Sequence, residues 1–207
     1  LLEGVTMIAL CATKSSGFVY TRFVPIIVPG MASLQLRVYA FIDGAHVRAA
    51  LQDLGVRWQD VNLRDSTIAA LHGAGSWRGG AMALTRVFVY DAVSADEPTD
   101  APSDVENWLT RNDELIDVHV RRGHLAGDRR STNRRRQKGV DVQLAVDALS
   151  GAFNAVYDVA LLVAGDADFA PVVEAIRDRG PLMIGCSFSR KLSDVLKEAC
   201  DRVVLLY

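Results

Sequence analysis

The feature that most constrains the fold is the segment at residues 159–170, VALLVAGDADFA. Its apolar run stops at Gly165, and an unbroken run bounded by a turn signal predicts a strand buried on both faces. Two aspartates, Asp166 and Asp168, follow the run with one alanine between them. Because ligands bind at the carboxyl ends of strands in open parallel sheets, both carboxylates are expected at that edge.

This pair of aspartates has two interpretations. Two carboxylates held so close repel each other, and a divalent cation that prefers oxygen ligands removes that cost. Alternatively, Asp166 belongs to a turn and Asp168 caps the following helix, since aspartate is a preferred N-cap residue. The segment alone does not decide between them, so the rest of the chain must.

Composition bounds the class of protein. Half of the 207 residues are apolar, which supports one ordinary domain with its own core. Three cysteines without CxxC spacing and four histidines without zinc spacing argue against a disulfide frame or a zinc site. The odd cysteine count fits a reducing, cytoplasmic compartment. No apolar run reaches the roughly 18 residues that a membrane span needs, so we expect no membrane partner.

The first 30 residues are expected to form a non-core extension, with the domain at residues 31–207. Their apolar patches are interrupted by polar residues and no basic segment precedes them, which argues against a secretory signal. The chain opens with leucine, whereas Met31, Ala32 and Ser33 resemble an ordinary start just before the first strand.

Strands and helices are predicted to alternate along the chain. Strands are expected at residues 36–42, 84–90, 115–120, the run before Gly165, 182–187 and 202–207. Helices are expected at residues 47–54, at 65–71, from a cap at Asp104 through Trp108, after Gly139, at 169–179 and at 191–199. This rhythm predicts an α/β fold with a parallel sheet and helices on both faces.

Four aspartates are predicted to converge on one crevice. Asp43 ends the first strand, Asp166 and Asp168 follow the fourth, and Asp141 opens the helix between them. The two strands are expected to be central and adjacent, where the order of the sheet reverses. Turn and capping roles explain each acid singly but do not predict their coincidence. Because a buried cluster of unpaired acids is costly without cations, the sequence predicts a metal site.

Four motifs together carry a family resemblance. They are FIDGAH at residues 41–46, KGVDVQLAVD at 138–147, LLVAGDADFAPVVEAIRDRG at 161–180 and SDVLKEACDRVVLL at 193–206. In this order, from about Arg37 to Tyr207, they resemble the NYN domain family, also called LabA-like or DUF88, of the PIN-like nuclease superfamily. The resemblance implies a PIN-like, Rossmannoid three-layer sandwich.

The same resemblance implies a metal-dependent ribonuclease that leaves 5′-phosphate and 3′-hydroxyl ends. Its catalytic and metal-binding residues correspond to Asp43, Asp141, Asp166 and Asp168, with Mg²⁺ or Mn²⁺ as the ion. One departure concerns His46, which stands where the family's DGxN motif has asparagine. Histidine can still bond to phosphate or metal, but it titrates near neutrality.

Residues 121–138 concentrate arginine although the formal net charge of the chain is only -2. We expect contacts with the backbone of a single-stranded RNA from His46 and from Arg129, Arg130, Arg134, Arg135, Arg136 and Lys138. A solvated loop is the alternative for such a charge run. Ser187 could lie at the rim of the crevice, and Asp147 is expected on another helical face than Asp141.

Two functions stay open at this point. The first is the ribonuclease, and the second is a catalytically weak PIN-like module that binds RNA or a regulatory protein partner, which His46 favours. A homo-oligomer also stays open. A nucleotide-binding Rossmann protein is disfavoured because the loop after the first strand, DGAH, lacks GxGxxG and a P-loop.

Overall fold

The computed structural model describes residues 5–8, 24–27, 34–76, 80–93, 103–126, 136–188 and 192–206. The chain divides into two compact units, residues 1–36 with 76–83, and residues 37–75 with 84–207. In the first unit, β1 (Val5–Ile8) and β2 (Val24–Ile27) pair antiparallel as a two-stranded sheet. The assignment of residues 1–30 to a non-core extension stays a prediction.

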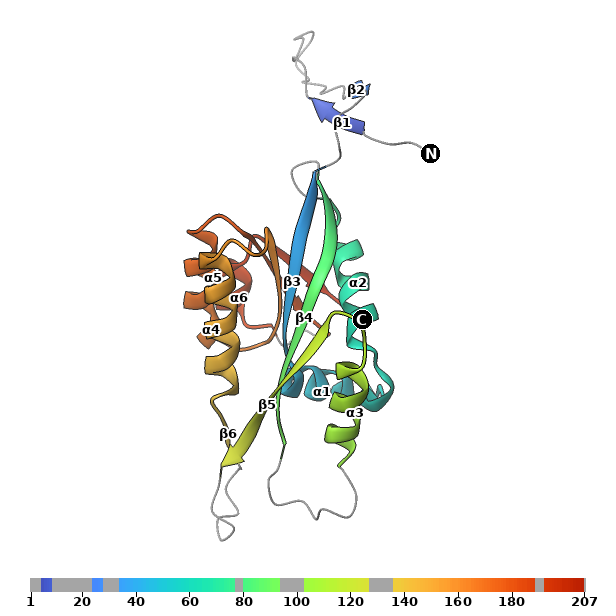
Figure 1. The fold of residues 1–207 in the computed structure, drawn as a ribbon, viewed down its shortest axis with the longest axis vertical. Coiled ribbons are helices and arrows are strands. Elements are labelled where there is room, and N and C mark those ends of the chain that lie inside the picture. Colours follow the sequence, from blue (N-terminus) through green and yellow to red (C-terminus); the bar gives the residue numbers. More distant parts are fainter. Residues whose placement is uncertain are drawn as a thin grey trace. The chain divides into compact units, whose positions relative to one another are not determined.

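A seven-stranded sheet runs through the second unit in the order β6-β5-β4-β3-β7-β8-β9 (Figure 1). Six strands run parallel, and β6 at the edge pairs antiparallel with β5. The strands are β3 (Gln35–Asp43), β4 (Ala81–Val93), β5 (Val118–Ala126), β6 (Arg136–Lys138), β7 (Val159–Val163), β8 (Leu182–Ser187) and β9 (Arg202–Leu205). The predicted parallel sheet is therefore confirmed.

The order of the sheet reverses between β3 and β7. From β3 the chain moves outward to β4 and β5, and from β7 it moves the other way to β8 and β9. The two central strands pair in parallel from Val38 with Val159 to Ile42 with Val163. Every residue of β7 is buried, as its apolar run predicts. This reversal places the ends of β3 and β7 side by side, where a parallel sheet opens a crevice.

Helices cover both faces of the sheet (Figure 1). One face carries α4 (Val140–Phe153), α5 (Ala170–Arg177) and α6 (Asp194–Ala199). The other carries α1 (Gly44–Asp53), α2 (Leu63–Ala74) and α3 (Asp104–Asp113). Two single 3₁₀ turns, η1 (Trp58–Asp60) and η2 (Ala167–Phe169), join these elements. The result is the predicted three-layer sandwich. None of the described helices is long and apolar enough to cross a membrane.

Several element boundaries differ from the sequence predictions, among them those of α3, β5 and β4. The N-cap of α3 is Ser103 rather than Asp104, and its hydroxyl accepts the backbone N–H of Glu106 at 3.2 Å. β5 begins later than predicted because Asp117, with a φ of 65°, belongs to a turn. β4 continues past its apolar run, so Asp91 lies inside the strand.

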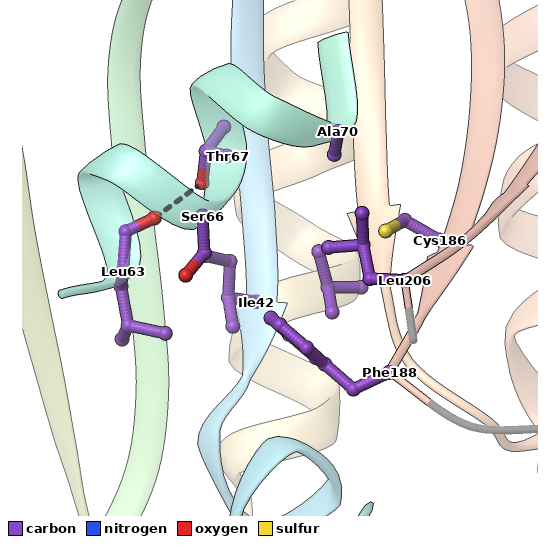
Figure 2. Close-up of a pocket in the computed structure, with 9 residues that line it drawn as sticks. Ile42, Leu63, Ser66, Thr67, Ala70, Cys186, Phe188 and Leu206 are labelled. Atoms are coloured by element: carbon purple, nitrogen blue, oxygen red, sulfur yellow. Dashed lines mark hydrogen bonds between the residues drawn. The ribbon is translucent and has the colours of Figure 1, made fainter. Parts of the chain in front are cut away.

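A small cavity lies between α2 and the sheet (Figure 2). It measures about 10 Å³ and is lined by Ile42, Leu63, Ser66, Thr67, Ala70, Val163, Cys186, Phe188 and Leu206. The Thr67 hydroxyl donates to the carbonyl of Leu63 at 2.7 Å, so it needs no partner in the cavity. A space of this size has room for one water at most and no room for a ligand. This layer is therefore core.

Candidate functional site

Asp43 is the last residue of β3 and the N-cap of α1. Its carboxylate accepts the backbone N–H of His46 at 3.1 Å, one of the groups that a helix start leaves unpaired. Burial raises the pKa of Asp43 to about 6, while the bond from His46 opposes this rise. The charges of Asp141 and Asp91 raise the pKa further. Asp43 is thus half-buried with other acids around it.

Asp141 lies in the first turn of α4, where a negative charge interacts favourably with the helix dipole. Gly139 precedes this helix with a φ of 83°, a conformation that glycine adopts without strain. Burial, and then the charges of Asp166 and Asp168, raise the pKa of Asp141. These three acids therefore lie close enough to influence one another.

The turn after β7 decides which aspartate is the cap. Asp166 is the N-cap of η2, and its carboxylate accepts the backbone N–H of Asp168 at 3.0 Å. The following helix, α5, has no side-chain cap. The capping interpretation was therefore wrong for Asp168 and applies to Asp166. The Asp168 side chain is exposed and makes no ion pair with a described residue.

Asp91 lies near the same edge of the sheet, and the sequence did not single it out as a site residue. It is fully buried, and both of its carboxylate oxygens accept hydrogen bonds from the Arg48 guanidinium, at 2.8 and 2.9 Å. A Cβ at Gly44 would meet Asp91 Oδ2 at 2.6 Å, so the glycine permits this close approach. The sequence could have indicated Asp91 as a site residue, because Asp91, like Asp43, directly follows the apolar run of its strand.

His46 joins two strands that are not neighbours. Its Nε2 lies 3.0 Å from the hydroxyl oxygen of Ser187, while its backbone N–H is bonded to Asp43. Ser187 is the last residue of β8 and is fully buried, rather than at the rim. Since β7 lies between β3 and β8, His46 connects the two strands that flank the Asp166 turn.

Asp147 has other partners than Asp141, the other acid of α4, in keeping with the prediction that the two lie on different faces of the helix. Its carboxylate accepts the Tyr90 hydroxyl at 2.9 Å and lies 3.6 Å from the Arg121 guanidinium. These contacts fasten α4 to β4 and β5. Asp147 therefore helps to fix the helix whose first turn carries Asp141.

The carboxylates of the predicted metal site are chemically suitable ligands, but within its described residues the structure does not gather them into a metal-binding group. Asp43, Asp141, Asp166 and Asp168, which we call the acidic edge, make no ion pair within the described part of the chain. Unpaired carboxylates that repel one another are the donors that hard divalent cations prefer. Within those same residues, however, no three His, Cys, Asp or Glu side chains form a group that could hold a metal ion.

The predicted basic segment is only partly described. Arg129, Arg130, Arg134 and Arg135 lie outside the described residues, as do the side chains of Arg136 and Lys138. The backbones of the last two belong to β6, in register with residues 124–126 of β5. The RNA-binding role of this segment stays a prediction.

The sequence matches the NYN domain family over residues 37–206. The chain belongs to the NYN domain family. This confirms the resemblance carried by the four motifs and assigns the chain to the PIN-like superfamily. NYN domains are generally nucleases, which implies nucleic acid as a partner, and PIN-like nucleases typically use divalent metals. No curated protein matches the chain.

The fold is similar to the crystal structure of a protein of unknown function from Vibrio parahaemolyticus. The two chains superpose with a TM-score of 0.53 and are 15% identical, over 87% of this chain and 97% of the other. At this identity the similarity shows the fold alone, and it supports the three-layer architecture.

Proposed function

We propose that this NYN domain is a metal-dependent ribonuclease that hydrolyses RNA phosphodiester bonds at the acidic edge. The observation that carries the proposal is electrostatic. Asp43 and Asp141 each have a pKa raised first by burial and then by other acids at the switch point of the sheet, and neither is paired with a described cation. Structural carboxylates in buried positions are normally paired, as Asp91 is.

We assign Mg²⁺ or Mn²⁺ to the acidic edge. Asp43 and Asp166 would hold the ion directly, and Asp141 and Asp168 directly or through water. Such an ion lowers the pKa of bound water and stabilises the departing oxygen. The backbone N–H groups that bond Asp43 and Asp166 orient their carboxylates before any ligand binds. Because its pKa is about 6, Asp43 is only half ionised at pH 6 and gains its full charge as the pH rises further.

The RNA backbone would be bound by His46 and by the basic residues of segment 129–138. Phosphate contacts of this kind give affinity without sequence choice. Two contacts support this role for His46: its ring lies 3.0 Å from the Ser187 hydroxyl, and its backbone N–H bonds Asp43 of the acidic edge. On its motifs we assign the chain to the LabA-like (DUF88) group, and on its free Cys186 and Cys200 to the reducing cytoplasm.

Cleavage of an end-labelled single-stranded RNA in Mn²⁺ tests the proposal. Asp43→Asn and Asp166→Asn should each lower the rate by about 10²-fold or more, because each removes a charge from the acidic edge. Asp178→Asn is the matched control, since Asp178 is exposed at the end of α5 and outside the acidic edge. No cleavage by folded wild-type protein, or equal rates in all variants, would contradict the proposal.

The second candidate is a catalytically weak module that binds RNA or a regulatory protein. His46, in place of the asparagine of the DGxN motif, is the observation that favours it. In this case the wild type should bind RNA without cleaving it, and His46→Asn should raise cleavage above the wild-type rate. A His46→Asn variant that cleaves no better than the wild type would count against this candidate.

A further inference from the structure

The outward side of α4 is apolar although solvent surrounds it. Val142, Val146 and Phe153 are 65%, 53% and 58% exposed, and Leu149 is half-buried. Their spacing of four, three and four residues aligns them along one side of the helix. We call these four residues the α4 stripe. The helix also buries Val140, Leu144, Ala148 and Ala152 against the sheet. A helix that is apolar on both sides is normally buried on both.

We propose that the α4 stripe binds the same stripe of a second copy of this chain, with the two helices antiparallel about a two-fold axis. In such an interface one patch must complement itself. The antiparallel arrangement brings Val142 against Phe153 of the second copy and Val146 against its Leu149. It also pairs opposite ends of the two helix dipoles.

The charges around the α4 stripe favour a second copy over another partner. A charge near a two-fold axis meets its own like charge, so a self-complementary patch should lack charges there. The other exposed side chains on this side of the helix are Gln143 and Ser150, both uncharged. The acid in the middle of the helix, Asp147, is bonded to Tyr90 and faces the sheet.

The two ends of the α4 stripe are electrostatically complementary. At one end, the Arg179 guanidinium lies 3.9 Å from the ring centroid of Phe153. At the other end, Val142 follows Asp141, an exposed acid. The pKa of Asp141 is raised by burial and then by the charges of Asp166 and Asp168. The antiparallel arrangement brings the cation of each copy toward the acids of the other, twice in the dimer.

The test is sedimentation equilibrium of the full chain at rising concentration. One helix stripe is small beside the roughly 800 Å² per partner of stable interfaces, so a weak dimer is expected. Val146→Glu should raise the dimer dissociation constant by about tenfold or more, because it buries a charge against the apolar Leu149 of the second copy and close to the two-fold axis. Val195→Glu is the matched control and should change nothing, since Val195 is 57% exposed on α6.

Ser150→Glu keeps the test valid if Val146→Glu perturbs folding, because Ser150 is already exposed and polar. It should also weaken the dimer, and Arg179→Glu should weaken it more at low salt than at high salt. A protein that stays monomeric up to about 1 mM would overturn the proposal. So would a dimer that the Val146 and Val195 variants weaken equally.

Disulfide crosslinking tests the orientation, in a Cys11→Ser background. A mixture of Val142→Cys and Phe153→Cys proteins should form crosslinked dimers under mild oxidation, whereas Val142→Cys alone should not. Efficient crosslinking of Val142→Cys to itself would overturn the antiparallel arrangement. Neither readout depends on nuclease activity, so the dimer and the proposed function can fail separately.

Discussion

Asp43 and Asp91 follow the apolar runs of neighbouring strands, yet their surroundings differ. Asp91 is fully buried and receives two hydrogen bonds from Arg48, so its charge is compensated within the fold. Asp43 is half-buried, has acids as neighbours, and carries a raised pKa of about 6. The two aspartates have similar positions in their strands, but Asp91 has a cation as its partner and Asp43 does not. A carboxylate with its own cation is structural, whereas one without is available to a ligand.

Asp141 of α4 and the two aspartates of the turn after β7 resemble Asp43 rather than Asp91, because no described cation pairs with them. The pKa of Asp141 is raised by burial and by two further acids, and no described cation pairs with it. The comparison therefore separates one paired aspartate from the four of the acidic edge. Substitutions at paired and unpaired positions test whether the two kinds of aspartate differ in this way.

Asp91→Ala is expected to have the largest effect on folding. It leaves the Arg48 guanidinium, whose side chain is 24% exposed, without the partner that compensates it. Removing one member of a buried ion pair costs about 3–5 kcal/mol, which urea unfolding measures. Asp168→Ala, at an exposed acid of the same edge, is the control and should cost less than about 0.5 kcal/mol. Equal losses in the two variants would remove the distinction.

Asp43→Asn should stabilise the metal-free protein at neutral pH. Because the pKa of Asp43 is about 6 in the fold against 3.8 ordinarily, the native state binds this proton more tightly than the unfolded state. The stability contributed by this group is present below about pH 4 and is lost as the pH rises through 6. Asparagine keeps the N-cap without the charge.

Unfolding in EDTA at several pH values measures this effect. The variant should exceed the wild type by about 3 kcal/mol at pH 7 and approach it near pH 4. A stability difference that does not change with pH would show that the Asp43 carboxyl is not perturbed as described.

Ser187→Ala should have the smallest effect, about 1 kcal/mol, because it removes one hydrogen bond to the half-buried His46 ring. A double-mutant cycle with His46→Ala supplies the control. If the two side chains act through their mutual contact, the second substitution should cost less in the Ser187→Ala background than alone. Fully additive losses would mean that His46 is held by other contacts.

The sequence predicted the centre of the fold well because its signals are local. An apolar run ending at Gly165 is enough to identify β7, and an aspartate after each central strand is enough to bring Asp43 and Asp166 to the switch point. The N-cap of α3 was predicted wrongly at Asp104, although Ser103 and Glu106 have the spacing of a capping box.

The pairing of the acids could not be predicted in the same way. Arg48 meets Asp91 across 43 positions, and His46 meets Ser187 across 141. No local pattern reports such partners, because they depend on how strands are ordered in the sheet. The sequence therefore predicted aspartates at this edge of the sheet, but it did not predict which of them would be paired with a cation in the folded chain.

Binding of Mn²⁺ to the metal-free protein, followed by the electron paramagnetic resonance signal of the free ion, tests the central claim most directly. The account predicts that the wild type and Asp178→Asn bind Mn²⁺ equally, and that Asp166→Asn weakens binding by about tenfold or more. Equal binding by all three proteins, or no binding by the folded wild type, would contradict the assignment of the unpaired aspartates to a metal site.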